Sequence, residues 1–319
     1  MNLIICEKES VANDFYKALS NTTISKRPYY IINNYIIFYT NGHALELFEP
    51  EEYDISYKKW NIEHLPIIIN TFKYKIKNTF IINNLKNILK SYSFDNVIVA
   101  TDAGREGELI ARELINYFNN YFSKKNISFY RFWTSSALTK EVIINNLNSL
   151  KPLKNYDCIY KQALARQRID WLIGINFSRY FTLKNNHLFT FGRLQTAILK
   201  IIYDNHISIN NFVSKPYYKF KVVADNNIIL YLLNNNHTTF DNINDIKNLN
   251  FVNCNLTLSK YDYNNKIIKR PLLPNLTAIQ KFASQYFHIS PSETLNIMQL
   301  LYEKYKVISY PRSSSRYIK

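Results

Sequence analysis

Three acidic side chains follow two apolar stretches and carry the kind of atoms that bind a hard metal ion. Glu7 follows residues 3–6, and Asp102 and Glu106 follow residues 97–101. Carboxylate oxygens suit Mg²⁺ much better than zinc, and a divalent ion there could hold or orient phosphates. An equally weighted alternative is that Asp102 and Glu106 stabilise the start of the next helix, where negative charge interacts well with the helix dipole.

Cationic and aromatic side chains offer contacts to a phosphate backbone. Lys8 could grip a phosphate oxygen, although a solvated lysine is the commoner situation. Arg166, Arg168 and Trp171 fall near one helical face, a composition suited to phosphate contact and base stacking. The alternative is a buried Trp171 with Asp170 paired to an arginine. Spacing alone gives the histidines no role.

Tyr310 is followed closely by a proline and an arginine. Pro311 disfavours the helical conformation at Tyr310, so we expect an extended chain in which Tyr310 and Arg312 share a face and can address one phosphate. A tyrosine hydroxyl, with a pKa of about 10, attacks phosphorus efficiently only where cations such as Arg312 and Lys8 stabilise the charge. The chain has 26 tyrosines, and nearly all must be structural.

The elements that must position these residues have an α/β pattern in the first half. Residues 3–6 and 97–101 read as buried strands, the first followed by a helix capped by Ser10 and the second by a helix over residues 108–118. This predicts a mainly parallel sheet with flanking helices. Ligands of such sheets gather at the carboxyl ends of the strands, where Glu7, Asp102 and Glu106 would lie.

The rest of the chain changes character twice. Residues 155–205 have helical periodicity, residues 215–258 have the texture of strands, and helices are predicted over residues 276–287 and 291–305 with Ser290 or Ser292 as a cap. Only five glycines occur, so each is expected to mark a positive φ or a close backbone approach.

Composition narrows the class of protein. The net charge of +16 over 319 residues favours a polyanionic partner, although codon bias toward Asn, Ile, Lys and Tyr could produce part of it. The three cysteines, Cys6, Cys158 and Cys254, are far apart, which argues against a zinc ribbon or a disulfide scaffold and fits a reducing cytoplasm. No apolar run approaches the length of a membrane span.

The order of motifs resembles the type IA DNA topoisomerases, most closely the plasmid-type branch of bacterial topoisomerase III. The motifs are Ile-Ile-Cys-Glu-Lys at 4–8, Gly-His at 42–43, Thr-Asp-Ala-Gly-Arg-Glu-Gly-Glu at 101–108, Arg-Phe-Trp-Thr-Ser-Ser at 131–136, Ala-Arg-Gln-Arg-Ile-Asp-Trp-Leu-Ile-Gly at 165–174, Gly-Arg-Leu-Gln-Thr at 192–196 and Ser-Tyr-Pro-Arg at 309–312. Several are weak individually, but together in this order they are highly specific.

The resemblance implies a fold and roles for particular residues. It implies a Toprim domain over residues 1–152, a helical single-strand DNA groove over 153–212, a β-rich arch over 213–270 and a helical active-site segment over 271–319, together forming part of a toroid. The implied roles are nucleophile for Tyr310, assistance by Arg312, phosphate contact by Lys8, metal binding by Glu7, Asp102 and Glu106, and DNA binding by Arg166, Arg168, Asp170, Trp171, Arg193 and Gln195.

Three departures from the family pattern matter. Gly104 stands where the usual Toprim pattern has a second Asp, so one Mg²⁺ is expected rather than two. Ser313 and Ser314 replace a Thr-Asp pair near the nucleophile. The chain ends nine residues after Tyr310, so we expect either an amino-terminal fragment of a longer topoisomerase or a truncated reading frame, which could be inactive by itself.

The function expected is cleavage of one DNA strand by Tyr310 through a 5′-phosphotyrosine, strand passage and resealing, which relaxes or decatenates DNA. Mg²⁺ is the implied cofactor, and ATP is not required, consistent with the absence of a GxxxxGK[ST] loop. The alternatives are a non-cleaving single-strand-binding protein and another Toprim enzyme, a primase or nuclease. We expect a cytoplasmic, DNA-associated monomer, with a helicase or single-strand-binding protein as possible partner.

Overall fold

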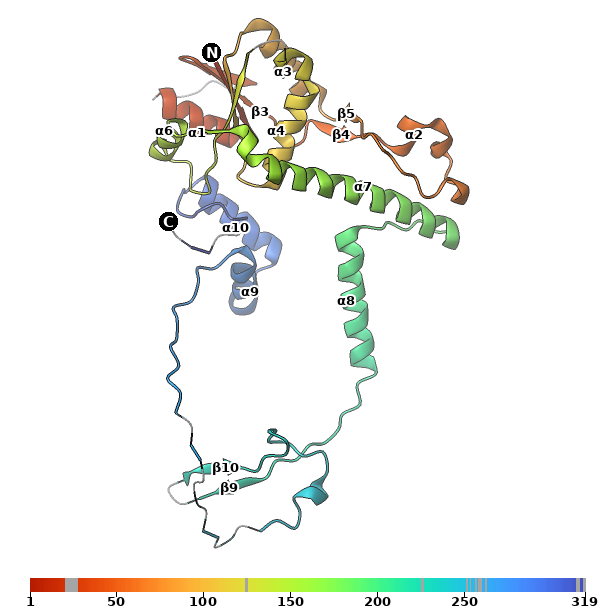
Figure 1. The fold of residues 1–319 in the computed structure, drawn as a ribbon, viewed down its shortest axis with the longest axis vertical. Helices are drawn as coiled ribbons and strands as arrows, with labels where there is room; N and C mark the ends of the chain where they lie inside the picture. Colours follow the sequence, from red (N-terminus) through yellow and green to blue (C-terminus); the bar gives the residue numbers. More distant parts are fainter. Residues whose placement is uncertain are drawn as a thin grey trace. The chain divides into compact units, whose positions relative to one another are not determined.

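The computed structural model describes residues 1–20, 28–123, 126–224, 227–250, 252, 254–255, 257, 260–261, 263–313 and 316–317. The chain divides into two compact units, one formed by Met1–Arg193 with Pro271–Lys319 and the other by Leu194–Arg270. The domain boundaries expected from the sequence stay a prediction. The first unit carries nearly all the candidate site residues, and its elements are labelled in Figure 1.

A six-stranded mixed sheet forms the centre of the first unit, in the order β2-β3-β1-β6-β7-β8. Neighbouring strands from β3 to β7 run parallel, whereas β2 and β8 are antiparallel edge strands. The strands are β1 (Asn2–Cys6), β2 (Tyr29–Ile32), β3 (Tyr35–Tyr39), β6 (Asn96–Ala100), β7 (Ser128–Arg131) and β8 (Lys151–Pro152). The predicted mainly parallel sheet is confirmed.

Helices cover both faces of this sheet. Alternate residues of β1 point to opposite sides, so Leu3 and Ile5 pack with α3 (Thr79–Ser91), while Ile4 and Cys6 pack with α1 (Glu9–Ser20). Figure 1 shows α3 and α4 (Arg105–Tyr117) on one side of the sheet and α1 and α6 (Lys140–Leu147) on the other. The short helix α5 (Asn119–Phe122) follows α4.

Two helix starts differ from the sequence prediction. Helix α1 begins at Glu9, so Ser10 lies inside its first turn and does not cap it; Asn41 Oδ1 accepts the Glu9 N–H instead, at 3.3 Å. Helix α4 begins at Arg105, three residues before the predicted Glu108, with Gly104 as its N-cap. Both shifts bring the acidic residues that follow β1 and β6 closer to helix amino termini.

Only some of the glycines have the positive φ or the close backbone approach that the sequence predicts. Gly42 has a φ of +95°, and a Cβ on Gly107 would lie 2.2 Å from the carbonyl oxygen of Asp102, so both positions require glycine. Gly104 has an extended φ of −167° and open space around the place of a Cβ. The expectation is therefore wrong for Gly104, where a side chain would fit.

An excursion between β4 (Leu45–Leu47) and β5 (Tyr74–Ile76) leaves the sheet and returns as an antiparallel pair. It contains α2 (Pro50–Tyr53) and the 3₁₀ helices η1 (Ile55–Lys58) and η2 (Ile62–His64). It packs on the long helix α7 (Asp157–Asn185), which follows the 3₁₀ helix η3 (Leu153–Tyr156). Asn176 of α7 holds it at Ile67, accepting the backbone N–H at 2.6 Å and donating to the carbonyl at 2.9 Å.

The remaining elements follow the predicted change of character. Helix α8 (Arg193–Asn210) leads into the second unit, which contains the antiparallel pair β9 (Lys221–Val223) and β10 (Ile229–Tyr231) and the 3₁₀ helix η5 (Ile243–Asp245). Helices α9 (Leu276–Phe287) and α10 (Pro291–Glu303) belong to the first unit again. Ser290, not Ser292, caps α10, with its side chain accepting the Glu293 N–H.

Candidate active site

Glu7 and Asp102 meet at the carboxyl ends of two adjacent parallel strands, β1 and β6. The Asp102 N–H donates to Glu7 Oε2 at 3.3 Å. Burial and the negative charge of Asp102 raise the pKa of the Glu7 carboxyl above its usual range. Two carboxylates that repel each other in a partly buried place form a site that gains from a cation.

Glu106 lies in the first turn of α4 and is turned away from this pair. Its side chain is 70% exposed, and Oε1 lies 2.9 Å from His43 Nε2. Across the described ranges of the chain, no three His, Cys, Asp or Glu side chains converge closely enough to hold a metal ion. The structure therefore brings together two of the three predicted metal ligands.

Lys8 lies between an acid of the sheet edge and an acid of α10. Its Nζ is 3.5 Å from Asp102 Oδ2 and 3.1 Å from Glu303 Oε1. Burial works against the charged form, but Asp102 and Glu303 outweigh it and raise the pKa of Lys8 above its usual range. Lys8 is thus positively charged, and a carboxylate occupies the place where a phosphate could bind.

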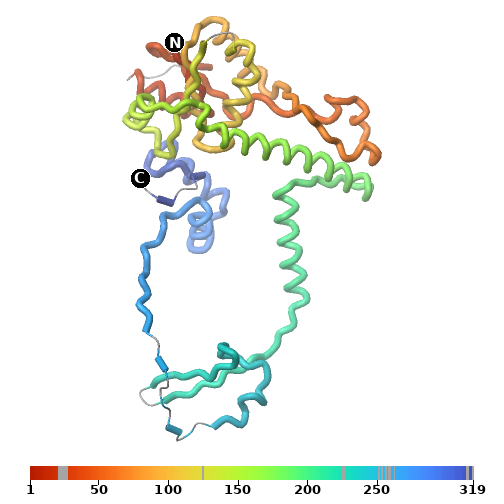
Figure 2. Tube along the Cα trace, viewed as in Figure 1, coloured from red at the N-terminus to blue at the C-terminus, as the bar shows by residue number. Residues whose placement is uncertain are grey.

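Tyr310 reaches the same sheet edge from the carboxyl-terminal end of the chain. Its hydroxyl donates to Asp102 Oδ2 at 3.1 Å, and its backbone N–H donates to the Ser135 carbonyl at 2.7 Å. Burial first, and then the charge and hydrogen bond of Asp102, raise the pKa of Tyr310 far above its usual range. Figure 2 shows this carboxyl-terminal segment, in blue, beside the amino-terminal domain.

The chain beyond Tyr310 differs from the extended geometry predicted. The Ser313 N–H donates to the Tyr310 carbonyl at 3.0 Å, which closes a turn through Pro311 and Arg312. Proline at the second position of a turn is favoured because its φ is already fixed near the value that the turn needs. Arg312 is exposed, and its charge acts on Tyr310 in the direction that lowers the pKa. Ser314 lies outside the described residues.

The space beside Tyr310 is small. A cavity of about 20 Å³ has Asp102, Thr134, Tyr302 and Tyr310 in its wall. This is room for about one water molecule. A group as large as a phosphate does not fit into this space.

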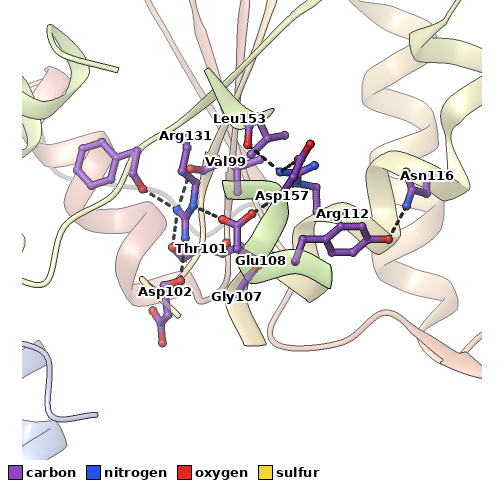
Figure 3. Close-up of polar contacts among 12 residues, drawn as sticks. Val99, Thr101, Asp102, Gly107, Glu108, Arg112, Asn116, Arg131, Leu153 and Asp157 are labelled. Carbon is purple, nitrogen blue, oxygen red and sulfur yellow. Dashed lines mark hydrogen bonds and ion pairs between the residues drawn. The ribbon is translucent and has the colours of Figure 1, made fainter. Parts of the chain in front are cut away.

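A buried ion pair, which sequence reasoning missed, supports the Asp102 loop (Figure 3). Arg131, 1% exposed, pairs with Glu108, which is fully buried. The guanidinium also donates to the carbonyls of Val99, Thr101 and Asp102 at 3.0, 2.8 and 2.8 Å. The signal in the sequence was a charged residue at the end of an apolar strand.

A second network connects His43 with helix α7. His43 Nδ1 lies 2.8 Å from Glu113 Oε2, and Gln167 Nε2 donates to Glu113 Oε1 at 2.8 Å. Burial disfavours the charged imidazole, but Glu113 and Glu106 outweigh it and raise the pKa of His43 to about 9. The sequence alone assigned no role to His43. The feature that could have indicated one is the turn at Gly42, after which His43 lies against α4.

Groove candidates on α7 and at the first residue of α8 form an exposed charge network. Arg193 Nε donates to Asp170 Oδ1 at 2.6 Å, and Arg166 Nε lies 3.5 Å from Asp170 Oδ2. The three side chains are 46%, 42% and 52% exposed for Arg193, Asp170 and Arg166. Gln195, also exposed, lies on α8 in the second unit and is not placed relative to them.

Trp171 and Arg168 face the excursion instead. The Trp171 indole donates to the Phe48 carbonyl at 3.0 Å and meets Phe72 edge to face, while the Arg168 guanidinium lies over Phe72. These contacts favour the packing alternative for Trp171, and its DNA-binding role stays a prediction. A cavity of about 360 Å³ nearby has Trp60, Trp171 and Phe191 in its wall.

No helix in the described part of the chain combines the length and apolar character needed to cross a membrane. Two family descriptions match the sequence: Toprim domain over residues 2–132 and DNA topoisomerase over residues 154–319. Toprim domains generally bind Mg²⁺.

Similar proteins include DNA topoisomerase 3 of Bacillus thuringiensis (strain Al Hakam), 38% identical over 99% of this chain and 43% of that protein. DNA topoisomerase 3 of Staphylococcus haemolyticus is 35% identical over 99% of this chain and 44% of its own length. The full-length topoisomerase I of Thermotoga maritima has the same fold, with a TM-score of 0.64 at 21% identity over 99% of this chain and 50% of that one.

The chain therefore spans less than half the length of these curated relatives. The DNA topoisomerase family nevertheless covers more than half of the chain, and a Toprim domain precedes that match. This chain belongs to the type IA DNA topoisomerases.

Proposed function

We propose that this chain carries the cleavage centre of a topoisomerase III-like enzyme, in which Tyr310 attacks a DNA phosphate. The observation that carries the proposal is the hydrogen bond from the Tyr310 hydroxyl to Asp102 Oδ2 at 3.1 Å, between residues 208 positions apart. Tyrosine, Lys8 and two Toprim acids thus share one sheet edge, which is the set of groups that phosphoryl transfer by a tyrosine requires.

In the proposed step the Tyr310 oxygen forms a bond to phosphorus, and the bond from phosphorus to the 3′ oxygen breaks. The phenol proton is lost, the 3′ oxygen leaves as a hydroxyl after taking up a proton, and a 5′-phosphotyrosine remains. Resealing reverses these changes, so the phosphodiester energy is conserved and ATP is not needed. Lys8 binds a non-bridging oxygen after leaving Glu303, and Arg312 balances the phenolate charge.

The residues present fit Mg²⁺ in part. Glu7 and Asp102 offer hard oxygen ligands, and the raised pKa of Glu7 marks a place that favours a cation. Glu106 would join them only after leaving His43. Bound there, Mg²⁺ supplies positive charge that orients phosphate oxygens. Gly104 offers no ligand, so a single ion is the expectation.

Single-stranded or underwound DNA is the proposed substrate, with relaxation or decatenation as the outcome in the whole protein. Support comes from the exposed network of Arg166, Asp170 and Arg193 and from the aromatic cavity beside it. A monomeric, cytoplasmic state associated with chromosomal or plasmid DNA, and a helicase or single-strand-binding partner, are proposals that rest on the family resemblance alone.

The test is to incubate the chain with end-labelled single-stranded DNA and Mg²⁺, stop with denaturant and map any adduct by mass spectrometry. We expect an adduct on Tyr310 that is lost in Tyr310→Phe and kept in Tyr305→Phe, because Tyr305 is an exposed neighbour. An adduct that survives Tyr310→Phe would refute the nucleophile assignment and favour another Toprim chemistry. Equal binding with and without Mg²⁺, with no adduct, would favour a protein that only binds.

A further inference from the structure

His43 connects an exposed acid to a buried one. Its ring nitrogens lie 2.9 Å from Glu106 Oε1 and 2.8 Å from Glu113 Oε2. Both partners are carboxylate oxygens, and an ionised carboxylate accepts hydrogen bonds without donating any, so an imidazole ring with a hydrogen on each nitrogen matches both contacts. The geometry therefore describes an imidazolium ion between two carboxylates.

Glu113 keeps this ion in place. Its side chain is 2% exposed, and a carboxylate so deeply buried requires a positive partner and further hydrogen bonds. His43 supplies the charge, and Gln167 of α7 donates to the other oxygen at 2.8 Å. The Tyr74 hydroxyl in turn donates to Gln167 Oε1 at 2.9 Å. The imidazolium is thus held on its buried side by Glu113 of α4, which is itself held by groups of α7 and β5.

Glu106 is the exposed end of this chain of contacts. Its side chain is 70% exposed, whereas His43 is 23% exposed. Glu7 and Asp102 are already joined through the Asp102 N–H, but Glu106 points to His43 and not to them. A cation bound between Glu7 and Asp102 would compete with the imidazolium for the same Glu106 carboxylate.

We propose that His43 is a positioning residue that holds Glu106 away from Glu7 and Asp102 in the DNA-free protein, so that metal binding must displace Glu106 from the imidazolium. The inference deepens the proposed function, because it concerns how the Toprim acids assemble around Mg²⁺. The His43–Glu106 pair is partly exposed, and pairs of that kind are weak enough to be exchanged for a divalent ion.

The test measures the Mg²⁺ affinity of the full chain by titration calorimetry, without DNA. His43→Gln should tighten Mg²⁺ binding by about two- to fivefold, the range expected for loss of one exposed ion pair. Since this change leaves Glu113 buried without a cation, His43→Gln with Glu113→Gln is the second variant, and it should show the same gain with a restored melting temperature. His64→Gln, in the excursion, is the matched control and should change nothing.

A Glu106→Gln background distinguishes a positioning effect of His43 from a general loss of stability of the structure. There, His43→Gln should give no gain in affinity, because the carboxylate for which the two cations compete is gone. A gain that persists in that background, or unchanged affinity in both His43 variants, overturns the inference. If Glu7→Gln abolishes Mg²⁺ binding while His43 has no effect, only this inference fails; if no protein binds Mg²⁺, the metal part of the proposed function fails with it.

Discussion

The sheet edge around Asp102 and the exposed face of α7 are built in opposite ways. At the sheet edge, Lys8, Asp102, Glu303 and Tyr310 come from four distant places and are tied by contacts of 3.1 to 3.5 Å in a partly buried setting. On α7, Arg166 and Asp170 are neighbours on one helical turn and lie largely in solvent. Chemistry that needs shifted pKa values depends on the first kind of construction, whereas binding a flexible polyanion needs only the second.

The largest effect on stability is expected at the buried ion pair of Arg131 and Glu108, which supports the sheet edge. Arg131→Met leaves Glu108 fully buried with Arg112, 3.5 Å away, as its remaining cationic partner, and it leaves the carbonyls that the guanidinium held without their donor. Together these losses should lower the free energy of unfolding by about 3–5 kcal/mol. Denaturant unfolding followed by circular dichroism measures this. Arg131→Met with Glu108→Leu removes both charges and should recover most of the loss. A loss under about 1 kcal/mol in the single variant would show that the edge does not depend on this pair.

The two glycines beside Asp102 give the next comparison. Gly107→Ala places a Cβ 2.2 Å from the Asp102 carbonyl oxygen, so the loop must shift, with an expected loss of about 1–3 kcal/mol. Gly104→Ala has open space and an extended backbone, and should change stability by less than about 0.5 kcal/mol. Thermal unfolding of both variants tests this, and equal losses would contradict the geometry.

Freeing Lys8 from its ion pair with Glu303 should have a smaller effect, on DNA affinity. Glu303→Gln removes one carboxylate from the ammonium group, 3.1 Å away, and should tighten binding of a single-stranded oligonucleotide by about two- to fivefold. Fluorescence anisotropy at low salt measures the affinity. Glu293→Gln, on the same helix but in its first turn, is the control. A gain of the same size in the control would mean that net charge alone is responsible.

The smallest effect on DNA binding is expected in the exposed charge network of Arg166, Asp170 and Arg193. Arg193→Gln removes one exposed guanidinium, so the slope of log affinity against log salt should fall by about 0.7 for single-stranded DNA, whatever the base sequence. Lys90→Gln, exposed at the end of α3, should leave the slope unchanged. If the loss of affinity occurred only with certain base sequences, Arg193 would contact bases. This charge network would then be more specific than a surface that binds any polyanion.

Sequence reasoning succeeded where the physics is local. The strands that end before Glu7 and Asp102, the helix α9 and the Ser290 cap follow from periodicity and capping, which depend on neighbours in the chain. It was less accurate at helix starts. Helix α1 begins at Glu9, before the expected Ser10 cap, and the Glu9 N–H there donates to a side chain distant in sequence, that of Asn41.

Contacts across the sheet produced what sequence reasoning missed. The sequence around Arg131 does not predict that its partner is Glu108 on α4. The sequence around His43 likewise does not predict its contacts with Glu106 and Glu113. The turn at Pro311 and Arg312 replaced the extended geometry because proline is compatible with both. The roles assigned to individual site residues stay predictions.

The sequence by itself determined the family, the α/β character of the first half and the residue types able to carry out phosphoryl transfer, because motif order and periodicity are written along the chain. The tertiary structure decided which of those residues meet. It joined Tyr310 to Asp102 and Lys8 to Glu303, and it turned Glu106 to His43. The physical reason is that charge pairing and pKa values depend on distance and burial in space, and residues 208 positions apart acquire both only through folding.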